Sequence, residues 1–419
     1  MDEWLLNASG RIGRYPHGVF ELKERIASRM KRIDPIAARV MFEKARAMER
    51  KGEELVHFEL GEPDFDTPKN IVNAAKRALE EGHTHYTPNS GLLELREAIS
   101  RKLKMDNQIE ADPRSEICVT VGAQEGAFLA VFSTIEPGDE VIVTDPGYFT
   151  HPNYVRMAGG TVVTLPVREE DGFRINPDLL EEKMTEKTKM ITLNSPANPT
   201  GSVLTRDNLE SIRAAVEKHD VLVLSDEIYE KMIYDGNKHY SIGAFPSIRD
   251  RVITINGFSK SYAMTGWRVG YLVAHKQMLA EMIKLHQNLV TCASSFAQMG
   301  AIEALDGSQE SVRSMVKEFD KRREIIVAGL NRIDGASCIR PGGAFYVFLN
   351  VGKLGKSSWE IADYLLEECK VVTTPGSGFG KCGEGYLRLS YATSIDQIEE
   401  GVGRIQSGLE RPMKRVRNG

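Results

Sequence analysis

The chain has 419 residues, 41% of them hydrophobic and 27% charged, which is enough to build two packed regions with a sizeable core. A formal net charge of -5 argues against a general nucleic-acid-binding protein, although the segment 411–417 is locally basic. Five widely spaced cysteines, without a Cys-x-x-Cys pair, predict neither a disulfide framework nor a zinc site and are typical of a reducing compartment.

The first hundred residues mix irregular and helical patterns. Residues 1–30 show no clear period, and we expect them to form an extension or arm. They lack a secretion signal, and no run of the chain approaches membrane-spanning length, so we expect a soluble cytoplasmic protein. The following patterns predict a helix over 36–48, a strand at 55–60, a loop rich in proline and glycine at 61–68, and helices near 69–81 and 91–104.

Seven short β-rich runs alternate with helical stretches in the middle of the chain. This alternation predicts an α/β fold in which a mostly parallel sheet is covered by helices on both faces. From about residue 276 a long helical region leads into a second α+β segment, with strands near 344–349 and 386–391. The seven runs are 117–121, 140–144, 161–165, 189–193, 221–224, 252–256 and 269–274.

Lys260 stands just after one of these buried strands, where open α/β sheets bind their ligands. A lysine that is partly desolvated there loses some of its preference for the charged form, and a neutral lysine is a nucleophile for carbonyls. The run 259–268 closely resembles the pyridoxal-phosphate lysine motif of class I/II aminotransferases, which are fold-type I enzymes. In that family the lysine carries the cofactor as an internal aldimine, and the arginine eight residues later, here Arg268, binds the phosphate. Many members have serine where this chain has Gly257, so Ser259 could supply the missing phosphate contact.

The resemblance covers nearly the whole chain from about residue 30. It implies a large pyridoxal-phosphate-binding domain at 69–305 and a small α+β domain formed by 31–68 together with 306–419. Residues 1–30 remain an amino-terminal arm.

Asp226 follows the apolar strand run 221–224 and Ser225. An aspartate at the end of a strand is typical either of a ligand-binding site or of a helix N-cap. A pyridoxal enzyme needs an acid beside the pyridine nitrogen, because the protonated ring is the better electron sink. The segment resembles the family's Asp-Glu-x-Tyr motif. That resemblance assigns Asp226 to the ring nitrogen and Tyr229 to the ring's phenolic oxygen, so Lys260, Asp226 and Tyr229 are the predicted catalytic residues.

Two turn segments supply further candidates. The cluster 194–201 is a turn signal by itself, but it resembles the family's Asn-Pro-x-Gly signature, which assigns Asn198 to the phenolic oxygen and the substrate carboxylate. Gly122, Ala123 and Gln124 join a strand to a helical pattern, and the amino terminus of a helix is a ready anion site. By resemblance these three residues contribute to the phosphate-binding loop.

Three aromatic or histidine side chains take their expected roles from the resemblance as well. Tyr148 corresponds to the residue that stacks on the cofactor ring, and His151 could orient Asp226, although a lone histidine is more often structural. Tyr86 corresponds to the tyrosine that reaches the phosphate of a neighbouring subunit, which implies a homodimer with shared active sites.

Arg388 stands in an apolar, alternating strand pattern, where an unpaired charge is costly. A structural aspartate or glutamate is one partner for it. The resemblance gives another, because the family's arginine at this place forms a bidentate pair with the α-carboxylate of the amino acid substrate. Gly61 corresponds to the glycine whose backbone lines the same pocket.

The resemblance implies transamination, in which an L-amino acid and a 2-oxo acid exchange an amino group in a ping-pong sequence, with glutamate and 2-oxoglutarate as one expected pair. A β-eliminating lyase of the same fold, such as a C–S lyase, uses the same cofactor residues and stays an alternative. A pyridoxal-binding regulator would need a DNA-binding domain, for which the short amino-terminal segment has no room.

Ile36 and Gln124 stand where some aspartate-specific members have serine and lysine, so the amino donor is left open. Arg39 could bind a side-chain carboxylate or be a surface cation. No metal is expected.

Overall fold

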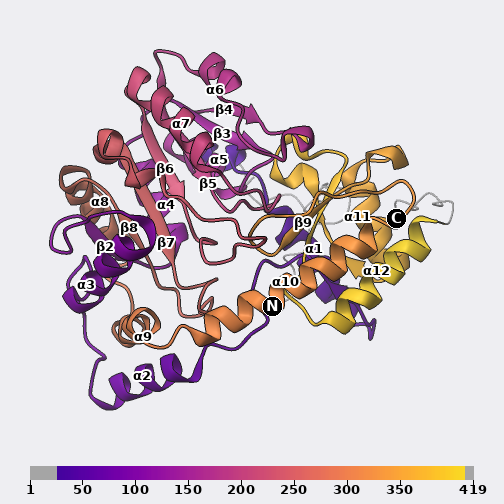
Figure 1. Ribbon diagram of the computed structural model, residues 1–419, viewed down its shortest axis with the longest axis horizontal. Helices are drawn as coiled ribbons and strands as arrows, with labels where there is room; N and C mark the ends of the chain where they lie inside the picture. The colour runs from indigo at the N-terminus through magenta and orange to yellow at the C-terminus, as the bar shows by residue number, and fades with distance from the viewer. Residues whose placement is uncertain (1–25, 411–419) are drawn as a thin grey trace, which may run out of the picture.

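A seven-stranded sheet forms the centre of the larger group of elements in the computed structural model, which describes residues 26–410 (Figure 1). Its strand order is β2-β8-β7-β6-β5-β3-β4, and every neighbouring pair is parallel except the two that involve β8. The mostly parallel α/β sheet is thus confirmed, and each predicted strand ends within two residues of the observed one. The strands are β2 (Ile117–Thr120), β3 (Glu140–Asp145), β4 (Thr161–Pro166), β5 (Thr188–Asn194), β6 (Leu222–Asp226), β7 (Val252–Gly257) and β8 (Gly270–Val273).

Helices cover both faces of this sheet, because parallel strands bury side chains on either side. Val141 packs with Leu129 of α4 and Met282 of α8, whereas its neighbour Ile142 packs with Ile212 of α7 on the opposite face. A third apolar cluster joins α2, α3 and α9. These helices are α2 (Lys69–Glu80), α3 (Leu93–Lys102), α4 (Ala123–Phe132), α5 (Thr150–Ala158), α6 (Pro177–Lys183), α7 (Arg206–His219), α8 (Lys276–Leu289) and α9 (Ser295–Asp306).

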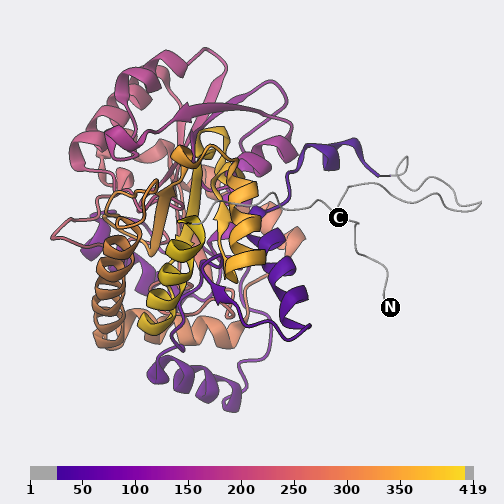
Figure 2. The ribbon, with the colours of Figure 1, turned by 90° about the vertical axis from the view of Figure 1, so that its right-hand side faces the viewer.

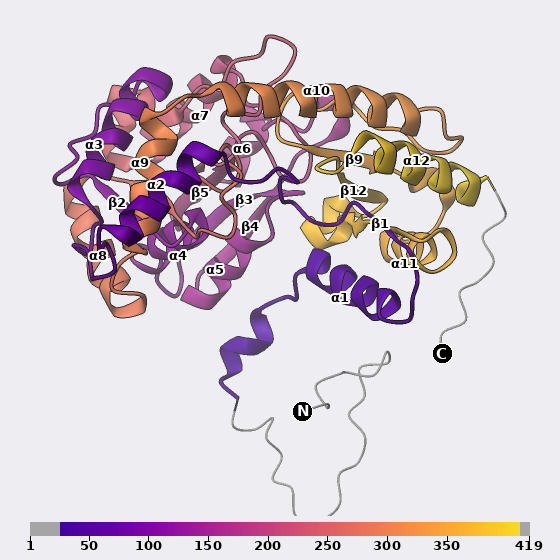
Figure 3. The same cartoon turned by 90° about the horizontal axis from the view of Figure 1, so that it is seen from below.

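A second group of elements packs beside the first and is built from both ends of the described chain (Figures 2 and 3). It contains a three-stranded antiparallel sheet in the order β11-β12-β9 and a parallel pair of β1 with β10. The predicted strand 55–60 contributes only two residues to β1, but the amide of Phe58 still donates to the carbonyl of Val372 at 2.9 Å. The elements are α1 (Ala37–Glu49), β1 (Val56–His57), α10 (Glu310–Leu330), β9 (Tyr346–Asn350), α11 (Ser358–Cys369), β10 (Val371–Val372), β11 (Thr374–Pro375), β12 (Tyr386–Ser390) and α12 (Ile395–Leu409).

Helix α10 runs along both groups (Figure 3). Its Val312 lies in the apolar cluster of α2, α3 and α9, whereas Phe319 and Ile326 lie in the core of the second group. Among the described helices, none combines the length and the apolar composition that a membrane crossing requires. The basic segment 411–417 and most of the predicted arm lie outside the described residues.

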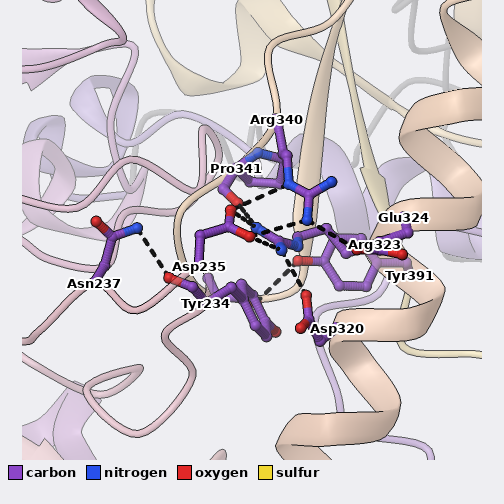
Figure 4. Close-up of polar contacts among 10 residues, drawn as sticks. Tyr234, Asp235, Asn237, Asp320, Arg323, Glu324, Arg340, Pro341 and Tyr391 are labelled. Atoms are coloured by element: carbon purple, nitrogen blue, oxygen red, sulfur yellow. Dashed lines mark hydrogen bonds and ion pairs between the residues drawn. The ribbon is translucent and has the colours of Figure 1, made fainter.

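A buried arginine ties α10 to the loop that follows Tyr229 (Figure 4). Arg323 is fully buried, and its two terminal nitrogens donate to the carboxylate of Asp235 at 2.7 and 2.8 Å. Its guanidinium also lies 4.5 Å from the ring centre of Tyr234 and donates to Asp320 at 2.5 Å. Arg340 binds the same Asp235 carboxylate from the outside. The loop is therefore held at both oxygens of one side chain.

Candidate active site

A cleft of about 620 Å³ opens at the carboxyl ends of the parallel strands and is closed on its other side by the second group of elements. Ligands of open α/β sheets bind at this edge, because the loops that leave neighbouring strands converge there. The cleft brings together twelve of the predicted residues, which are Gly61, Ala123, Gln124, Tyr148, His151, Asn198, Asp226, Tyr229, Ser259, Lys260, Arg268 and Arg388.

Lys260 follows β7, and its ammonium nitrogen donates to the backbone carbonyl of Gly61 at 2.5 Å. Burial lowers the pKa of Lys260 to about 8. The negative charge of Glu62 raises the pKa and so opposes burial, whereas the positive charge of Arg268 lowers it further. With this pKa, roughly a tenth of the lysine is neutral at pH 7, far more than for an ordinary lysine, and the neutral form attacks carbonyls.

Asp226 is the last residue of β6, and its side chain is buried. One carboxylate oxygen accepts a hydrogen bond from the backbone amide of Ile228 at 3.1 Å, so the residue stabilises the turn after the strand and no α-helix begins there. The other oxygen lies 3.6 Å from Nε2 of buried His151. That nitrogen has no hydrogen-bond partner among the described residues. The structure therefore brings His151 against Asp226, as the sequence suggested.

Tyr229 forms a hydroxyl pair that the sequence did not reveal. Its phenolic oxygen lies 2.6 Å from that of Tyr346 on β9, and burial raises the pKa of Tyr229 well above its ordinary value. The hydroxyl of Tyr346 also approaches Gly61 so closely that a Cβ there would lie 2.1 Å from it. A side chain at position 61 would thus displace the Tyr346 hydroxyl from the cleft.

Arg388 lies on β12 with 2% of its surface exposed. It donates to the side-chain oxygen of Asn198 at 3.2 Å, to the hydroxyl of Thr374 at 3.3 Å and to the backbone carbonyl of Glu59. Within residues 26–410 no carboxylate forms an ion pair with it, and its Nε has no hydrogen-bond partner. Burial lowers the pKa of Arg388, since nothing nearby neutralises the charge fully. The structural aspartate or glutamate that the sequence left open as a partner of Arg388 is therefore absent among the described residues.

An anion-binding corner lies at the amino terminus of α4. Gly122 precedes the helix with φ +78, and a Cβ there would lie 2.4 Å from the guanidinium of Arg268. Arg268 has φ +54 and donates to the carbonyl of Thr265 at 3.0 Å, which fixes its side chain toward the helix end. Backbone amides and a guanidinium are the donors that a phosphate prefers.

Gly257 lies outside this corner. A Cβ on it would meet the backbone of Gly270 at 3.1 Å, so its lack of a side chain serves strand packing between β7 and β8. Ser259 does line the cleft beside Lys260.

This donor set suits pyridoxal phosphate. Arg268 and the start of α4 would hold the phosphate, Asp226 would face a protonated ring nitrogen, and Lys260 offers an amine to an aldehyde. Space agrees as well, since a side chain at Gly122 would displace the guanidinium of Arg268 from this corner.

Comparison with known proteins decides the family. Residues 53–405 match the family model described as aminotransferase class I and II. The chain belongs to this family. It is 43% identical to an aspartate aminotransferase of Pyrococcus abyssi over 92% of this chain and 98% of that protein. It is 40% identical to aromatic-amino-acid aminotransferase 2 of Thermococcus litoralis, with the same coverage of both chains.

A solved structure agrees with the sequence comparisons. The aspartate aminotransferase of Thermus thermophilus with maleate superposes with a TM-score of 0.87, at 36% identity over 91% of this chain and 99% of that one. The fold-type I architecture is thus confirmed. The protein is a pyridoxal-phosphate-dependent aminotransferase, which transfers amino groups between small molecules.

Two predicted residues of the aminotransferase lie apart from the others. Gly122 stands behind Arg268 and does not line the cleft itself. Tyr86 lies in the loop between α2 and α3 with 87% of its surface exposed, and it does not line the cleft of its own chain. Its role at a neighbouring subunit stays a prediction.

Among the cleft residues to which the sequence assigned no role are the polar side chains Tyr346, Glu59 and Asn194. Asn194 stands in a segment already singled out, at the end of a predicted strand, and its side-chain oxygen accepts from the amide of Asn198 at 2.8 Å. Strand position alone could have found it. Tyr346 and Glu59 come from the second group of elements and are found only in three dimensions.

Proposed function

We propose that this aminotransferase exchanges an amino group between an L-amino acid and 2-oxoglutarate in two half-reactions, with Lys260 as the residue that acts on the substrate's α-carbon. The observation that carries this proposal is the pair of unlike basic groups in one cleft. Lys260 has a pKa of about 8, and Arg388 is buried, charged and without a carboxylate from the described chain. An amino acid substrate has a carboxylate that can pair with Arg388 and an α-carbon proton that neutral Lys260 can accept.

Arg388 binds the α-carboxylate of the substrate, and the side chain of Asn198 steadies the guanidinium at 3.2 Å. A fork of parallel N–H donors fixes the carboxylate plane, which turns the bond to be broken at the α-carbon toward Lys260. The neutral amine of Lys260 then takes the proton from that carbon. When bound, pyridoxal phosphate supplies the electron sink for that bond.

The remaining residues would hold and polarise the cofactor ring. Asp226 would keep the ring nitrogen protonated, Tyr229 would donate to the phenolic oxygen, and Tyr148 would pack against the ring. Ala123, Gln124, Ser259 and Arg268 form the phosphate site.

His151 supports Asp226 from behind, with Nε2 at 3.6 Å from the carboxylate. We expect a His151→Asn variant to retain the cofactor but to convert amino acids more slowly, because Asp226 would lose a neighbour that orients it. Stopped-flow half-reaction rates measure this effect.

2-Oxoglutarate as acceptor is supported by Arg39, a cation of the cleft that has no ion pair with a described carboxylate. It lies on α1, with its guanidinium 5.9 Å from the ring centre of Phe42. Because Lys260, Arg268 and Arg388 are already engaged, Arg39 is free to bind the second carboxylate of a dicarboxylic acid.

The Arg39 assignment is tested by an Arg39→Gln variant. We expect KM for 2-oxoglutarate to rise roughly tenfold, while KM for pyruvate, which has one carboxylate, stays unchanged. Arg46→Gln is the matched control, because Arg46 lies on the same helix but pairs with Glu49 away from the cleft. An equal change for both acceptors would remove Arg39 from substrate recognition.

The reaction itself is tested by the absorbance of the holoenzyme with a panel of amino acids. We expect an amino acid to convert the cofactor to its amino form and a 2-oxo acid to restore it, whereas Lys260→Ala does neither. The panel names the amino donor. Release of ammonia and pyruvate without any 2-oxo acid would instead show the eliminating lyase.

We further infer a cytoplasmic homodimer with shared active sites, supported by the exposed Tyr86. The division into a large domain at 69–305 and a small domain at 31–68 and 306–419 is supported by the two groups of elements, with α10 extending between them.

A further inference from the structure

Asp145 is a buried carboxylate to which the reaction above gives no task. It ends β3, and 4% of its surface is exposed. No cation of the described chain forms an ion pair with it. Oδ2 accepts a hydrogen bond from the backbone amide of Lys381 at 3.1 Å, and Oδ1 accepts one from the amide of Cys382 at 2.9 Å. Burial raises the pKa of Asp145, while the two amides oppose that change. The thiol of Cys382 and the charge of Lys381 also stabilise the carboxylate, but a buried charge without an ion pair remains costly, so the contact needs a reason.

The loop that supplies those amides is shaped around the carboxylate. Gly380 has φ +126, and a Cβ there would lie 2.1 Å from Oδ1 of Asp145. Any other residue at 380 would push the loop away and strain its backbone. The contact therefore joins the end of a strand in the central sheet to a loop of the second group at a fixed distance.

Both sides of this contact lead directly to the active site. On the sheet side, Gly147 donates its amide to the carbonyl of Phe379 at 2.8 Å, and Tyr148 is the next residue. On the loop side, the buried ring of Phe379 lies 5.1 Å from the guanidinium carbon of Arg388. Phe149 also packs on Phe379, with ring centres 5.9 Å apart.

We propose that Asp145 is a positioning residue that sets the separation between Tyr148 and Arg388, and thereby between the ring side and the carboxylate side of the cleft. This inference rests on the proposed role of Arg388. If the distance between the two sides changes, Arg388 holds the substrate carboxylate less well, because a bidentate pair depends on the fixed placement of both donors. Loss of the contact should therefore weaken substrate binding, while Lys260, Asp226 and Arg268, which form no hydrogen bond or ion pair with Asp145, still hold the cofactor.

The test uses the holoenzyme of an Asp145→Asn variant, which keeps the side-chain shape but removes the charge and one acceptor. Binding of maleate, a dicarboxylate that cannot be transaminated, is measured by titration calorimetry. We expect its Kd to rise roughly tenfold, with KM for the amino acid rising in parallel, while kcat and the cofactor absorbance change little. Unchanged Kd and KM would overturn the proposal.

A second variant approaches the contact from the other side. Gly380→Ala places a methyl group against Oδ1 of Asp145 and should weaken maleate binding in the same way, even if Asp145→Asn does not fold. Glu169→Gln is the control. Glu169 also links the two groups of elements, since it accepts from Tyr386 at 2.9 Å and Asn350 at 2.7 Å, but it does not line the cleft. If Glu169→Gln raised the Kd equally, general loosening would explain the effect and Asp145 would have no special part.

An Arg388→Lys variant distinguishes failure of the Asp145 proposal from failure of the proposed carboxylate-binding role of Arg388. If Arg388→Lys leaves maleate binding unchanged, the proposed role of Arg388 fails. If Arg388→Lys weakens binding and neither Asp145→Asn nor Gly380→Ala does, only the positioning role of Asp145 fails.

Discussion

At the scale of single residues, the charge state of Lys260 is open to direct measurement. Burial lowers its pKa to about 8 and the Glu62 carboxylate opposes that change. In the protein freed of cofactor, the amine is protonated below about pH 8 and neutral above it. We expect labelling of Lys260 by an amine-directed reagent to rise between pH 7 and 9 with its midpoint at that pKa. Peptide mass spectrometry reads the labelled fraction.

A Glu62→Gln variant tests whether the Glu62 carboxylate raises the pKa of Lys260. Removing the carboxylate should lower the pKa of Lys260 further, so the labelling midpoint should move to lower pH. Glu80→Gln, on α2 and away from the cleft, should leave the midpoint where it is. A midpoint near the ordinary lysine value in the unaltered protein would contradict the burial argument.

The sequence could predict the site residues that stand at strand ends, but not those whose role depends on contacts with distant parts of the chain. Lys260, Asp226 and Asn198 stand at or shortly after the ends of buried strands, which a pattern of apolar residues reveals, and the family resemblance then assigned their roles. Tyr346 is different, because its hydroxyl matters only through contacts with Tyr229 and Gly61, which are far away in the chain. No local pattern distinguishes such a tyrosine from one that simply packs in a strand.

At the scale of elements, the Arg323 contact (Figure 4) makes the loop after Tyr229 depend on α10. We expect Asp235→Asn to lower the free energy of unfolding by roughly 1–3 kcal/mol, because a fully buried guanidinium loses one of its two charged acceptors and keeps Asp320 and the carbonyl of Pro341. Denaturant unfolding of the two proteins measures the difference. Asp250→Asn, at an exposed carboxylate without an ion pair to a described residue, should change little.

The same contact predicts a pH dependence. Hydrogen bonds from Arg323 and Arg340 hold the pKa of Asp235 below its usual range. A carboxyl with a depressed folded-state pKa stabilises the protein above its unfolded pKa, which is about 3.9, and the contribution is lost as the pH falls below that value. The gap between the unaltered protein and Asp235→Asn should therefore be full at pH 6 and shrink toward pH 3. A gap that stays constant would show that charge plays no part in the contact.

Long, periodic elements were predictable and short, contact-dependent ones were not. Most strands of the central sheet appear as apolar runs because both of their faces are buried, whereas the edge strand β4 buries only Leu165. β10 and β11 have two residues each, and they exist because β1 and β12 lie beside them. Such strands carry no pattern of their own, since their hydrogen-bond partners come from distant parts of the chain.

At the scale of the whole molecule, the position of Tyr86 predicts that two subunits build each active site. Its side chain is exposed and outside the cleft of its own chain. The nearby Asn89 donates to Gln287 at 2.8 Å, which places this loop beside the end of α8, where Leu289 and Val290 are exposed as well. An apolar surface of this kind suits a second copy of the chain.

Mixed dimers test this arrangement. A Lys260→Ala subunit is inactive at its own site but keeps Tyr86, whereas a Tyr86→Ala subunit keeps Lys260 but cannot complete its neighbour's phosphate site. If Tyr86 acts across the interface, a mixed dimer contains one site with both residues intact. Random reassortment of equal amounts should then recover about a quarter of the normal activity, because half of the dimers are mixed and each has one intact site of two. If Tyr86 served its own subunit, or if the protein were a monomer, mixing would restore nothing beyond the activity of the two variants measured apart.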